Sequence, residues 1–189
     1  FEYFIREQEW EHYFNYWLSE QQAWVAEMGF AAQNLRVREH SKEELSHYSK
    51  RTCDLEYHTP FGWKEMFGLA YRTDFDLGNH MKHSGENLMY TDPESGEKFV
   101  PHVIEPTFGM TRLTLMALLA AYQEEEAPTA ESGKTEMRVV LKLHPRIAPY
   151  KVAVLPLSKN ERLVPKARDV HALLASRWMT DYDETQSIG

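Results

Sequence analysis

The sequence predicts an α+β protein of 189 residues, in which helices and strands occupy separate stretches of the chain. Three observations indicate this class: an early helical stripe of aromatic residues, several short strand-like segments in the middle, and a strand–helix–strand unit near the C-terminus. Hydrophobic residues make up 42% of the chain, enough to bury one domain, or one domain plus part of another.

The chain opens with a predicted short strand, Phe1–Ile5, and then a long helix that extends to about Met28. Apolar residues recur along this helix at helical spacing and form a face that we assign to packing: Trp10, Phe14, Trp17, Trp24 and Met28. Gly29 is expected to stop the helix. Ser41–Glu44 (SKEE) matches a capping box and predicts a short helix.

The middle of the chain alternates strand-like runs with turn residues. The predicted strands are Cys53–Tyr57, Tyr71–Leu77 and Phe99–Glu105. Thr59–Gly62 and Thr91–Lys98 are predicted turns, because they carry the Pro, Gly and Asp typical of exposed turns. An almost wholly apolar helical run, Leu113–Tyr122, follows.

The C-terminal third begins after the most linker-like segment, Ala127–Glu136, which is small and polar with Pro and Gly. We predict a strand at Met137–Leu143 and then a strand, a helix and a strand at Lys151–Leu157, Asn160–Arg177 and Met179–Asp183. A continuous apolar strand followed by a crossover helix predicts a partly parallel sheet. Such a unit alone would leave a sheet edge open and its helix half covered.

Composition limits the classes of protein. No apolar run approaches the roughly 20 residues needed to span a bilayer, and the start lacks a basic-then-apolar secretory pattern. One cysteine, Cys53, excludes an internal disulfide and a zinc site with several thiolates. We therefore expect a cytoplasmic protein without a membrane partner.

Charge is divided unevenly. Lys134–Arg177 holds ten Lys or Arg against three Asp or Glu, a balance of +7. Because the net charge of the whole chain is −8, the remaining residues together carry −15. This asymmetry is typical of a chain in which only the C-terminal third faces phosphates. On charge alone, however, solvated surface positions are the simpler interpretation.

Glu105 to Arg112 sets a carboxylate, a proline, a glycine and an arginine directly before the apolar helix. This order suits a strand that ends at a small polar substrate, with a cation at a helix start. An amine could meet Glu105 and a polyphosphate could meet Arg112. The alternative is a strand–turn–helix whose charges face water.

Two stretches resemble the glycyl-tRNA synthetases of the α2 dimeric type, which are class II aminoacyl-tRNA synthetases. Pro101–Arg112 (PHVIEPTFGMTR) is similar to motif 3 of that family, and Gly62–Leu77 (GWKEMFGLAYRTDFDL) is similar to the segment that lines the glycine and ATP sites. The resemblance continues through nearly every segment after Cys53 and more loosely before it.

The resemblance implies a glycine–tRNA ligase. In this reaction glycine and ATP form glycyl-adenylate and pyrophosphate, and the glycyl group then passes to tRNA(Gly). The implied ligands are ATP as a substrate and Mg²⁺ bridging its phosphates. The implied partner besides tRNA(Gly) is a second copy of the protein in a homodimer, with no role for DNA.

The resemblance also assigns roles to residues. Arg72 would pair with the glycine carboxylate, Glu105 would accept hydrogen bonds from the ammonium group, and the side chains of Thr107 and Phe108 would exclude larger amino acids. The implied glycine-binding set is Arg72, Glu105, Pro106, Thr107, Phe108 and Gly109. The implied ATP-binding set is Glu65, Met66, Gly109, Met110, Thr111 and Arg112. Arg112, at the γ-phosphate end of ATP, and Glu105 are the implied catalytic residues, and no metal ligand is assigned.

Three positions depart from the family pattern. Thr107 stands where serine is usual, Thr111 where an acidic residue is common, and Lys64 where a small residue is frequent. None of these departures contradicts glycine as the substrate.

Several of these residues also have structural interpretations. Glu65 and Arg72 could form an ion pair across a turn. Asp74 and Asp76 alternate in the manner of metal ligands, but we expect them to fix neighbouring backbone or side chains. His80 and His83 lie at helical spacing without a third ligand nearby, so we interpret them as surface residues. His102 is interpreted as structural.

Family motifs 1 and 2 have no counterpart in the sequence, and Phe1–Phe4 (FEYF) resembles the strand just after motif 2. We therefore expect an internal piece of a longer synthetase, inactive alone. Residues 1–148 would hold the C-terminal part of the catalytic domain, a mostly antiparallel sheet flanked by helices, and residues 149–189 the first half of an α/β anticodon-binding domain. One alternative is a non-catalytic synthetase-like module that binds tRNA or a protein; another is an enzyme that charges a carrier other than tRNA.

Overall fold

The computed structural model describes residues 1–129 and 133–185. The chain divides into two compact units, one from Phe1 to Lys142 and one that begins at Leu143. Both units combine helices with strands, so the predicted α+β class is confirmed. None of the helices in this described part has the length and apolar character needed to cross a membrane.

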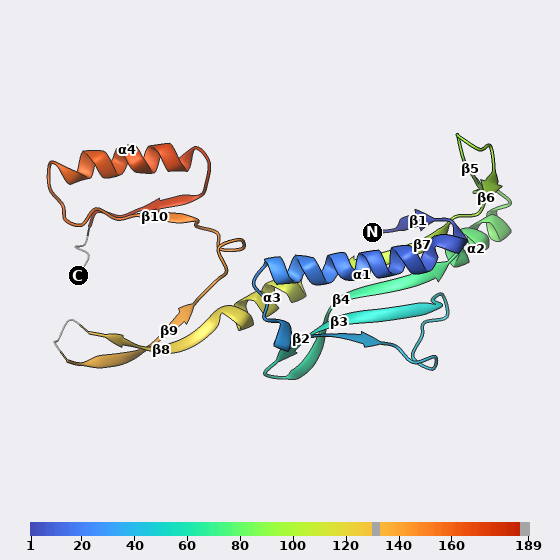
Figure 1. Ribbon diagram of the computed structural model, residues 1–189, viewed down its shortest axis with the longest axis horizontal. Helices are drawn as coiled ribbons and strands as arrows, with labels where there is room; N and C mark the ends of the chain where they lie inside the picture. Colours follow the sequence, from blue (N-terminus) through green and yellow to red (C-terminus); the bar gives the residue numbers. More distant parts are fainter. Residues whose placement is uncertain (130–132, 186–189) are drawn as a thin grey trace. The chain divides into compact units, whose positions relative to one another are not determined.

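A five-stranded sheet, in which every neighbouring pair is antiparallel, forms the base of the first unit (Figure 1). Its strand order is β1-β7-β4-β3-β2. The bounds are Tyr3–Ile5 for β1, Leu35–Glu39 for β2, Arg51–Thr59 for β3, Gly62–Thr73 for β4 and His102–Phe108 for β7. The predicted turn between β3 and β4 is confirmed: the Thr59 hydroxyl donates to the Gly62 carbonyl at 2.7 Å, and Gly62 has a φ of 88°.

Helix α1, Trp10–Glu27, lies along one face of this sheet (Figure 1). The predicted packing role of its aromatic stripe is confirmed, because Phe14 is fully buried and the Trp10 ring stacks on Tyr71 with centroids 4.7 Å apart. Strands and helix together form one core cluster, whose buried members are Ile5, Phe14, Cys53, Leu69, Tyr71 and Ile104. Within this core, burial raises the pKa of the Cys53 thiol to about 11.

One buried hydrogen bond and the turns at its two ends fix how α1 meets the sheet. The Gln21 amide, itself buried, donates to the Gly68 carbonyl of β4 at 3.0 Å. A 3-10 turn, Glu7–Glu9, leads into the helix from β1. The helix stops where predicted, since Gly29 has a φ of 88°.

The other face of the sheet is polar. Successive side chains of a strand point to opposite faces, so the residues that alternate with the core positions lie on this side. On β4 these residues are Gly68, Ala70 and Arg72, and on β7 they are Glu105 and Thr107. The register sets Gly68 opposite Thr107 and Ala70 opposite Glu105.

The predicted strand Tyr71–Leu77 is wrong beyond Thr73. Thr73 has a φ of 57°, a left-handed conformation that ends the strand, and α2 follows at Phe75–Ser84. The first helical bond forms at once, because the Gly78 N–H donates to the Asp74 carbonyl at 2.7 Å. Asp76 therefore lies in the first turn of a helix.

The helix predicted at Ser41–Glu44 is also wrong. The capping-box bond does form, since the Ser41 N–H donates to the Glu44 carboxylate at 3.0 Å, but the segment stays a turn. Glu44 also pairs with Arg38 of β2. The chain must return into β3 within a few residues, which leaves no length for a helix.

The predicted strand Phe99–Glu105 is divided by a proline. β5, Tyr90–Thr91, pairs with β6, Lys98–Phe99, around the predicted exposed turn, which is confirmed. β7 then begins after Pro101, which has no N–H to donate to a sheet.

The predicted helical run Leu113–Tyr122 forms α3, which begins earlier than predicted, at Met110, and ends at Ala121. β8, Tyr122–Pro128, then pairs with β9, Thr135–Leu141, so the predicted strand at Met137–Leu143 is confirmed to Leu141. The segment Ala127–Glu136 is not a linker in its described parts, which belong to this hairpin; residues 130–132 lie outside the described residues.

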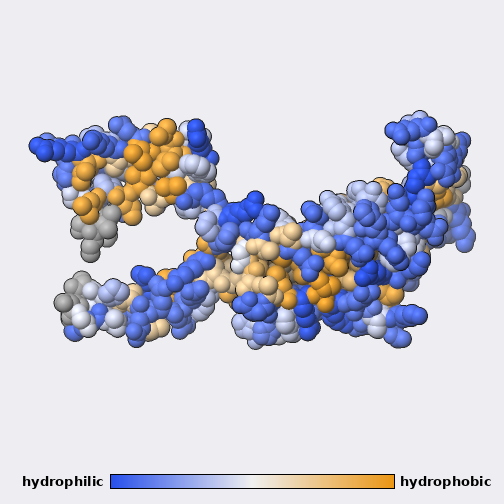
Figure 2. Space-filling view, in the orientation of Figure 1, coloured by the Kyte–Doolittle hydropathy of each residue, from blue (hydrophilic) through white to orange (hydrophobic). Residues whose placement is uncertain are grey.

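The second unit contains the predicted parallel pair. β10, Val152–Val154, and β11, Thr180–Tyr182, are parallel and joined by helix α4, Leu163–Ala175. The helix is shorter than predicted, because the Asn160 side chain accepts N–H bonds from Arg162 and Leu163 in the turn before it. No residue of α4 is fully buried, and large apolar side chains are exposed on this unit (Figure 2), among them Leu157, Leu173 and Met179.

The packing of α1 on the sheet leads to a stability prediction. Replacing the fully buried Phe14 by alanine should lower the free energy of unfolding by about 3–5 kcal/mol, because the cavity cannot refill. Urea unfolding followed by tryptophan fluorescence measures this loss. The half-exposed Tyr16 of the same helix provides the control, and Tyr16→Ala should change the free energy by about 0.5 kcal/mol or less. Equal effects of the two changes would contradict the assigned core.

Candidate functional site

The polar face brings Arg72 and Glu105 together, although 33 residues separate them in sequence. The Arg72 Nη1 donates to Glu105 Oε2 at 2.6 Å, and both side chains are partly buried. The contact follows from the register, because Glu105 lies opposite Ala70 and Arg72 is the next residue of β4 on that face.

Asp76 binds the other edge of the same guanidinium. Arg72 Nε donates to Asp76 Oδ2 at 2.8 Å, and Nη2 donates to Oδ1 at 3.0 Å. The Tyr48 ring lies 4.1 Å from the Arg72 Cζ, in cation–π contact. The bonds to Asp76 and then Glu105 raise the pKa of Arg72, and the Arg72 bonds lower the pKa of Asp76. Both groups are therefore charged at neutral pH.

Small residues form the floor beside this pair. Gly68 and Ala70 leave the centre of β4 without bulky side chains on the polar face. A Cβ atom added at Gly68 would lie 3.8 Å from Glu65 Oε1, 3.9 Å from Asp54 Oδ1 and 3.9 Å from the Thr107 Cβ. Three polar side chains thus surround a position that has no side chain.

Asp54 is a member of this face that sequence reasoning missed. Its Oδ2 forms a hydrogen bond with His40 Nε2 at 2.7 Å, and Arg38 Nη1 lies 3.8 Å from the same oxygen. Asp54 has no clear signal in the sequence, because the same strand also carries Arg51, Glu56 and His58. Gly68 was missed for a different reason, because a missing side chain gives no chemical signal.

A second charged pair lies at the start of α3. Arg112 Nη1 is 2.7 Å from Glu65 Oε1. The two residues line a cavity of about 430 Å³ together with Thr59, Phe61, Lys64, Leu115 and Met116. Of the remaining nucleotide candidates, Met110 and Thr111 are exposed in the first turn of α3, whereas the Met66 side chain is fully buried.

Gly109 is required where β7 passes into α3. A Cβ atom there would lie 3.3 Å from the Met66 carbonyl oxygen and 3.4 Å from the Arg112 Cδ. The backbone of β7 therefore approaches β4 closely at this point, and glycine keeps Arg112 beside Glu65.

Two expectations about side chains need correction. The Phe108 ring packs on Trp24 and Phe67, with centroids 5.4 and 5.0 Å away, so it lies on the α1 face and does not narrow the space beside Thr107. Pro106 is buried on that same face. Of this trio, Thr107 alone shares the polar face with Arg72 and Glu105.

The alternative pairing of Glu65 with Arg72 is also wrong, because Glu65 pairs with Arg112 while Arg72 pairs with Asp76 and Glu105. The expectation that Asp76 fixes a neighbouring side chain is confirmed by the same contacts.

The histidines near this region do not form a ligand set. His80 and His83 are exposed on α2. Across residues 1–129 and 133–185, no group of three or more His, Cys, Asp or Glu is arranged to hold a metal ion. His102 Nδ1 lies 2.6 Å from the Tyr71 hydroxyl, a structural contact, and burial raises the pKa of Tyr71 to about 12.

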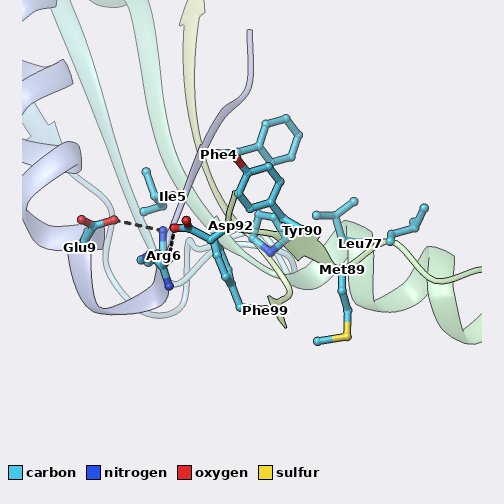
Figure 3. A pocket seen from close by; sticks show the side chains of 11 residues that line it. Phe4, Ile5, Arg6, Glu9, Leu77, Met89, Tyr90, Asp92 and Phe99 are labelled. Carbon is cyan, nitrogen blue, oxygen red and sulfur yellow. Dashed lines mark hydrogen bonds and ion pairs between the residues drawn. The ribbon is translucent and has the colours of Figure 1, made fainter. Parts of the chain in front are cut away.

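A larger, mostly apolar cavity of about 670 Å³ lies beside β1, α2 and the β5–β6 hairpin (Figure 3). Its polar rim is already paired, because Arg6 binds Asp92 and Glu97 at 2.5 Å each. The Arg6 guanidinium also lies 4.3 Å from the Phe99 ring. Sequence reasoning gave no sign of this cavity, since its residues come from three separate segments.

The chain aligns over its whole length with glycine–tRNA ligases. It is 48% identical over 191 residues to the ligase of Cutibacterium acnes, 49% over 191 residues to that of Thermobifida fusca, and 50% over 188 residues to that of Caldanaerobacter subterraneus subsp. tengcongensis. The resemblance to glycyl-tRNA synthetases is confirmed. Each alignment covers 100% of this chain but 39–41% of the relative, so the chain spans about 40% of the length of these synthetases. No family model matches the chain.

Substitution of Gly109 tests the close approach between β7 and β4. Gly109→Ala should lower the free energy of unfolding by about 1–3 kcal/mol, because the new methyl group presses on the carbonyl of Met66 in a paired strand. Thermal or urea unfolding measures the change. Gly78→Ala in α2 meets only ordinary contacts, at 3.6 Å and beyond, and should be neutral or stabilising by up to about 1 kcal/mol. A neutral Gly109→Ala would contradict the assigned close approach.

Proposed function

We propose that this chain supplies the amino-acid and nucleotide pockets of a glycine–tRNA ligase, which activates glycine with ATP and transfers it to tRNA(Gly). The observation that carries this proposal is the contact of Arg72 with Glu105, 2.6 Å apart on a floor of Gly68 and Ala70. A guanidinium and a carboxylate side by side match the two charges of an α-amino acid. The alignment with glycine–tRNA ligases supports the same assignment.

In the proposed complex, glycine lies over the small residues of β4. Its carboxylate binds Arg72, whose planar guanidinium can donate to both oxygens, and its ammonium group binds Glu105. Thr107, opposite Gly68, limits the space beside the α-carbon. Larger amino acids are rejected by overlap, because a site cannot exclude them through missing contacts.

The proposed nucleotide site is the cavity of Glu65 and Arg112. Arg112 is exposed in the first turn of α3, where the helix dipole also favours phosphate. We assign it to the γ-phosphate end of ATP, with Glu65, Met66 and Gly109–Thr111 as the other nucleotide contacts. In this scheme the chain aligns the glycine carboxylate with the α-phosphate and neutralises charge.

Mg²⁺ is expected to enter with ATP as a bridge between its phosphates. The described side chains do not build a three-ligand metal cluster, so no step is assigned to the ion.

The remaining parts of the proposal concern the whole protein. Residues 1–148 would belong to a class II catalytic domain, and the antiparallel sheet described above would be part of the sheet of that domain. Residues 149–189 would begin an anticodon-binding domain, and the excess of Lys and Arg in Lys134–Arg177 supports contact with tRNA phosphates. A cytoplasmic homodimer completes the proposal.

Exchange of labelled pyrophosphate into ATP tests the activity, with glycine, alanine and serine in parallel assays of the whole protein. Exchange that depends on glycine alone would support the proposal. Exchange with none of the three would overturn it in favour of a non-catalytic synthetase-like module that binds tRNA or a protein. Equal exchange with alanine would remove the assigned role of Thr107.

Arg72→Ala should reduce kcat/KM for glycine in this assay by about 100-fold or more, because it removes the carboxylate partner and leaves two acidic side chains without their cation. Arg138→Ala is the matched control, since it breaks an arginine–glutamate pair on the exposed β8–β9 hairpin. An unchanged kcat/KM for Arg72→Ala would refute the carboxylate assignment.

A further inference from the structure

The guanidinium of Arg72 is shared between two carboxylates in an unequal way. Arginine has five N–H groups in one plane, and Asp76 takes two of them, from Nε and Nη2. Glu105 takes one, from Nη1. Within the described residues, one N–H on Nη1 and one on Nη2 keep no hydrogen-bond partner.

Asp76 and Tyr48 fix the plane of this guanidinium. A two-bond contact along the Nε–Nη2 edge sets the rotation of the group, and the Tyr48 ring at 4.1 Å covers one of its faces. The Arg72 side chain is only 16% exposed. Its remaining edge, formed by Nη1 and Nη2, is thereby directed to the side on which Glu105 lies.

The backbone explains why Asp76 can make this contact. β4 ends at Thr73, whose left-handed conformation turns the chain directly into α2. The first turn of that helix returns Asp76 to Arg72, four residues earlier. Had the strand continued to Leu77, Asp76 would lie four strand positions beyond Arg72, too far along β4 to reach the guanidinium edge.

Without Asp76, Arg72 would have one remaining carboxylate partner. Arginine and a carboxylate prefer two parallel N–H···O bonds, so a released guanidinium would turn to bind Glu105 through both oxygens. In that arrangement the Arg72 N–H groups needed by a substrate carboxylate and the Glu105 oxygens needed by an ammonium group would be bound to each other. Asp76 prevents this closure by holding the opposite edge.

We propose that Asp76 is a positioning residue that holds Arg72 open toward the substrate carboxylate and limits its contact with Glu105 to one oxygen, Oε2, so that the other can accept from the ammonium group. This inference rests on the proposed function. The charges agree with it, because one guanidinium between two carboxylates leaves one negative charge beside the floor of Gly68 and Ala70. An amino acid brings an ammonium group to that charge, whereas a simple carboxylic acid does not.

The chain offers a matched control for this clamp. Arg51 Nε and Nη2 donate to the two oxygens of Glu39 at 3.0 and 3.1 Å, and the Arg51 Cζ lies 4.3 Å from the Phe14 ring. This contact repeats the edge-and-face geometry of Arg72, but it lies between β2 and β3, away from Glu105. Glu39→Gln therefore reports what the loss of one such carboxylate does to stability alone.

The test measures pyrophosphate exchange by the whole protein carrying Asp76→Asn, with glycine and ATP varied separately. The KM for glycine should rise about tenfold, while the KM for ATP and the kcat at saturating glycine change less than about twofold. Glu39→Gln should leave all three constants unchanged. Tyr48→Leu, which removes the ring under the guanidinium, should raise the glycine KM about threefold.

Each other outcome overturns the inference. A glycine KM within twofold of the original for Asp76→Asn would mean that Arg72 needs no help from Asp76. Parallel changes in both KM values and in the unfolding midpoint would indicate a structural role only. Arg72→Ala separates the two proposals: if it raises the glycine KM and Asp76→Asn does not, the positioning role fails alone, and if neither variant changes it, the proposed glycine site fails as well.

Discussion

The packing of α1 against one face of the five-stranded sheet sets the rest of the first unit. Burial of Phe14 against Tyr71 and Leu69 commits alternate residues of β4 to the apolar side. Because strand side chains alternate, the same commitment places Gly68, Ala70 and Arg72 on the other side without further interactions. A shift of one residue in this register would bury Arg72 and expose Tyr71. Helix α1 packs on the opposite face, yet it determines which side chains lie on the polar face.

On the polar face, Arg72 and Arg112 are both held by carboxylates from other elements. Arg72 of β4 bridges Asp76 of α2 and Glu105 of β7, and Arg112 of α3 is held by Glu65 of β4. The two clusters therefore add side-chain links between β4 and three other elements, α2, β7 and α3. Partly buried pairs of this kind contribute less to stability than to orientation, because desolvation offsets much of their attraction. Their arrangement is suited to ligands that carry both signs of charge.

Much of this unit was predictable from the sequence, and the failures have identifiable physical causes. The helical stripe of α1, the strand before the Thr59–Gly62 turn and the parallel pair in the second unit follow from periodicity and turn chemistry. The strand after that turn was predicted only from Tyr71, whereas β4 begins at Gly62. Asp74–Leu77 was misassigned because a single left-handed residue, Thr73, ended a strand that its side chains would have continued. Local propensity does not report such a backbone choice.

The residues of the candidate site were predicted from the family resemblance, and the sheet register then showed on which face of the sheet each of them lies. Alternation along β7 separates Thr107 from Phe108 by the full thickness of the sheet, which a list of motif residues does not express. Asp54 was missed because it lies outside the two stretches that carry the family motifs, and Gly68, although inside one of them, was missed because it has no side chain. Their position became evident only through the pairing of β3 with β4.

The location of Cys53 has a consequence for how the protein meets oxidants. Its thiol, the sole one in the sequence, sits in the core beneath α1, and burial holds the pKa near 11, so the reactive thiolate is scarce as well as shielded. Sulfenic acid formation and cross-linking between chains both require the helix to leave the sheet first. The rate at which Cys53 is oxidised would then report how often the first unit opens.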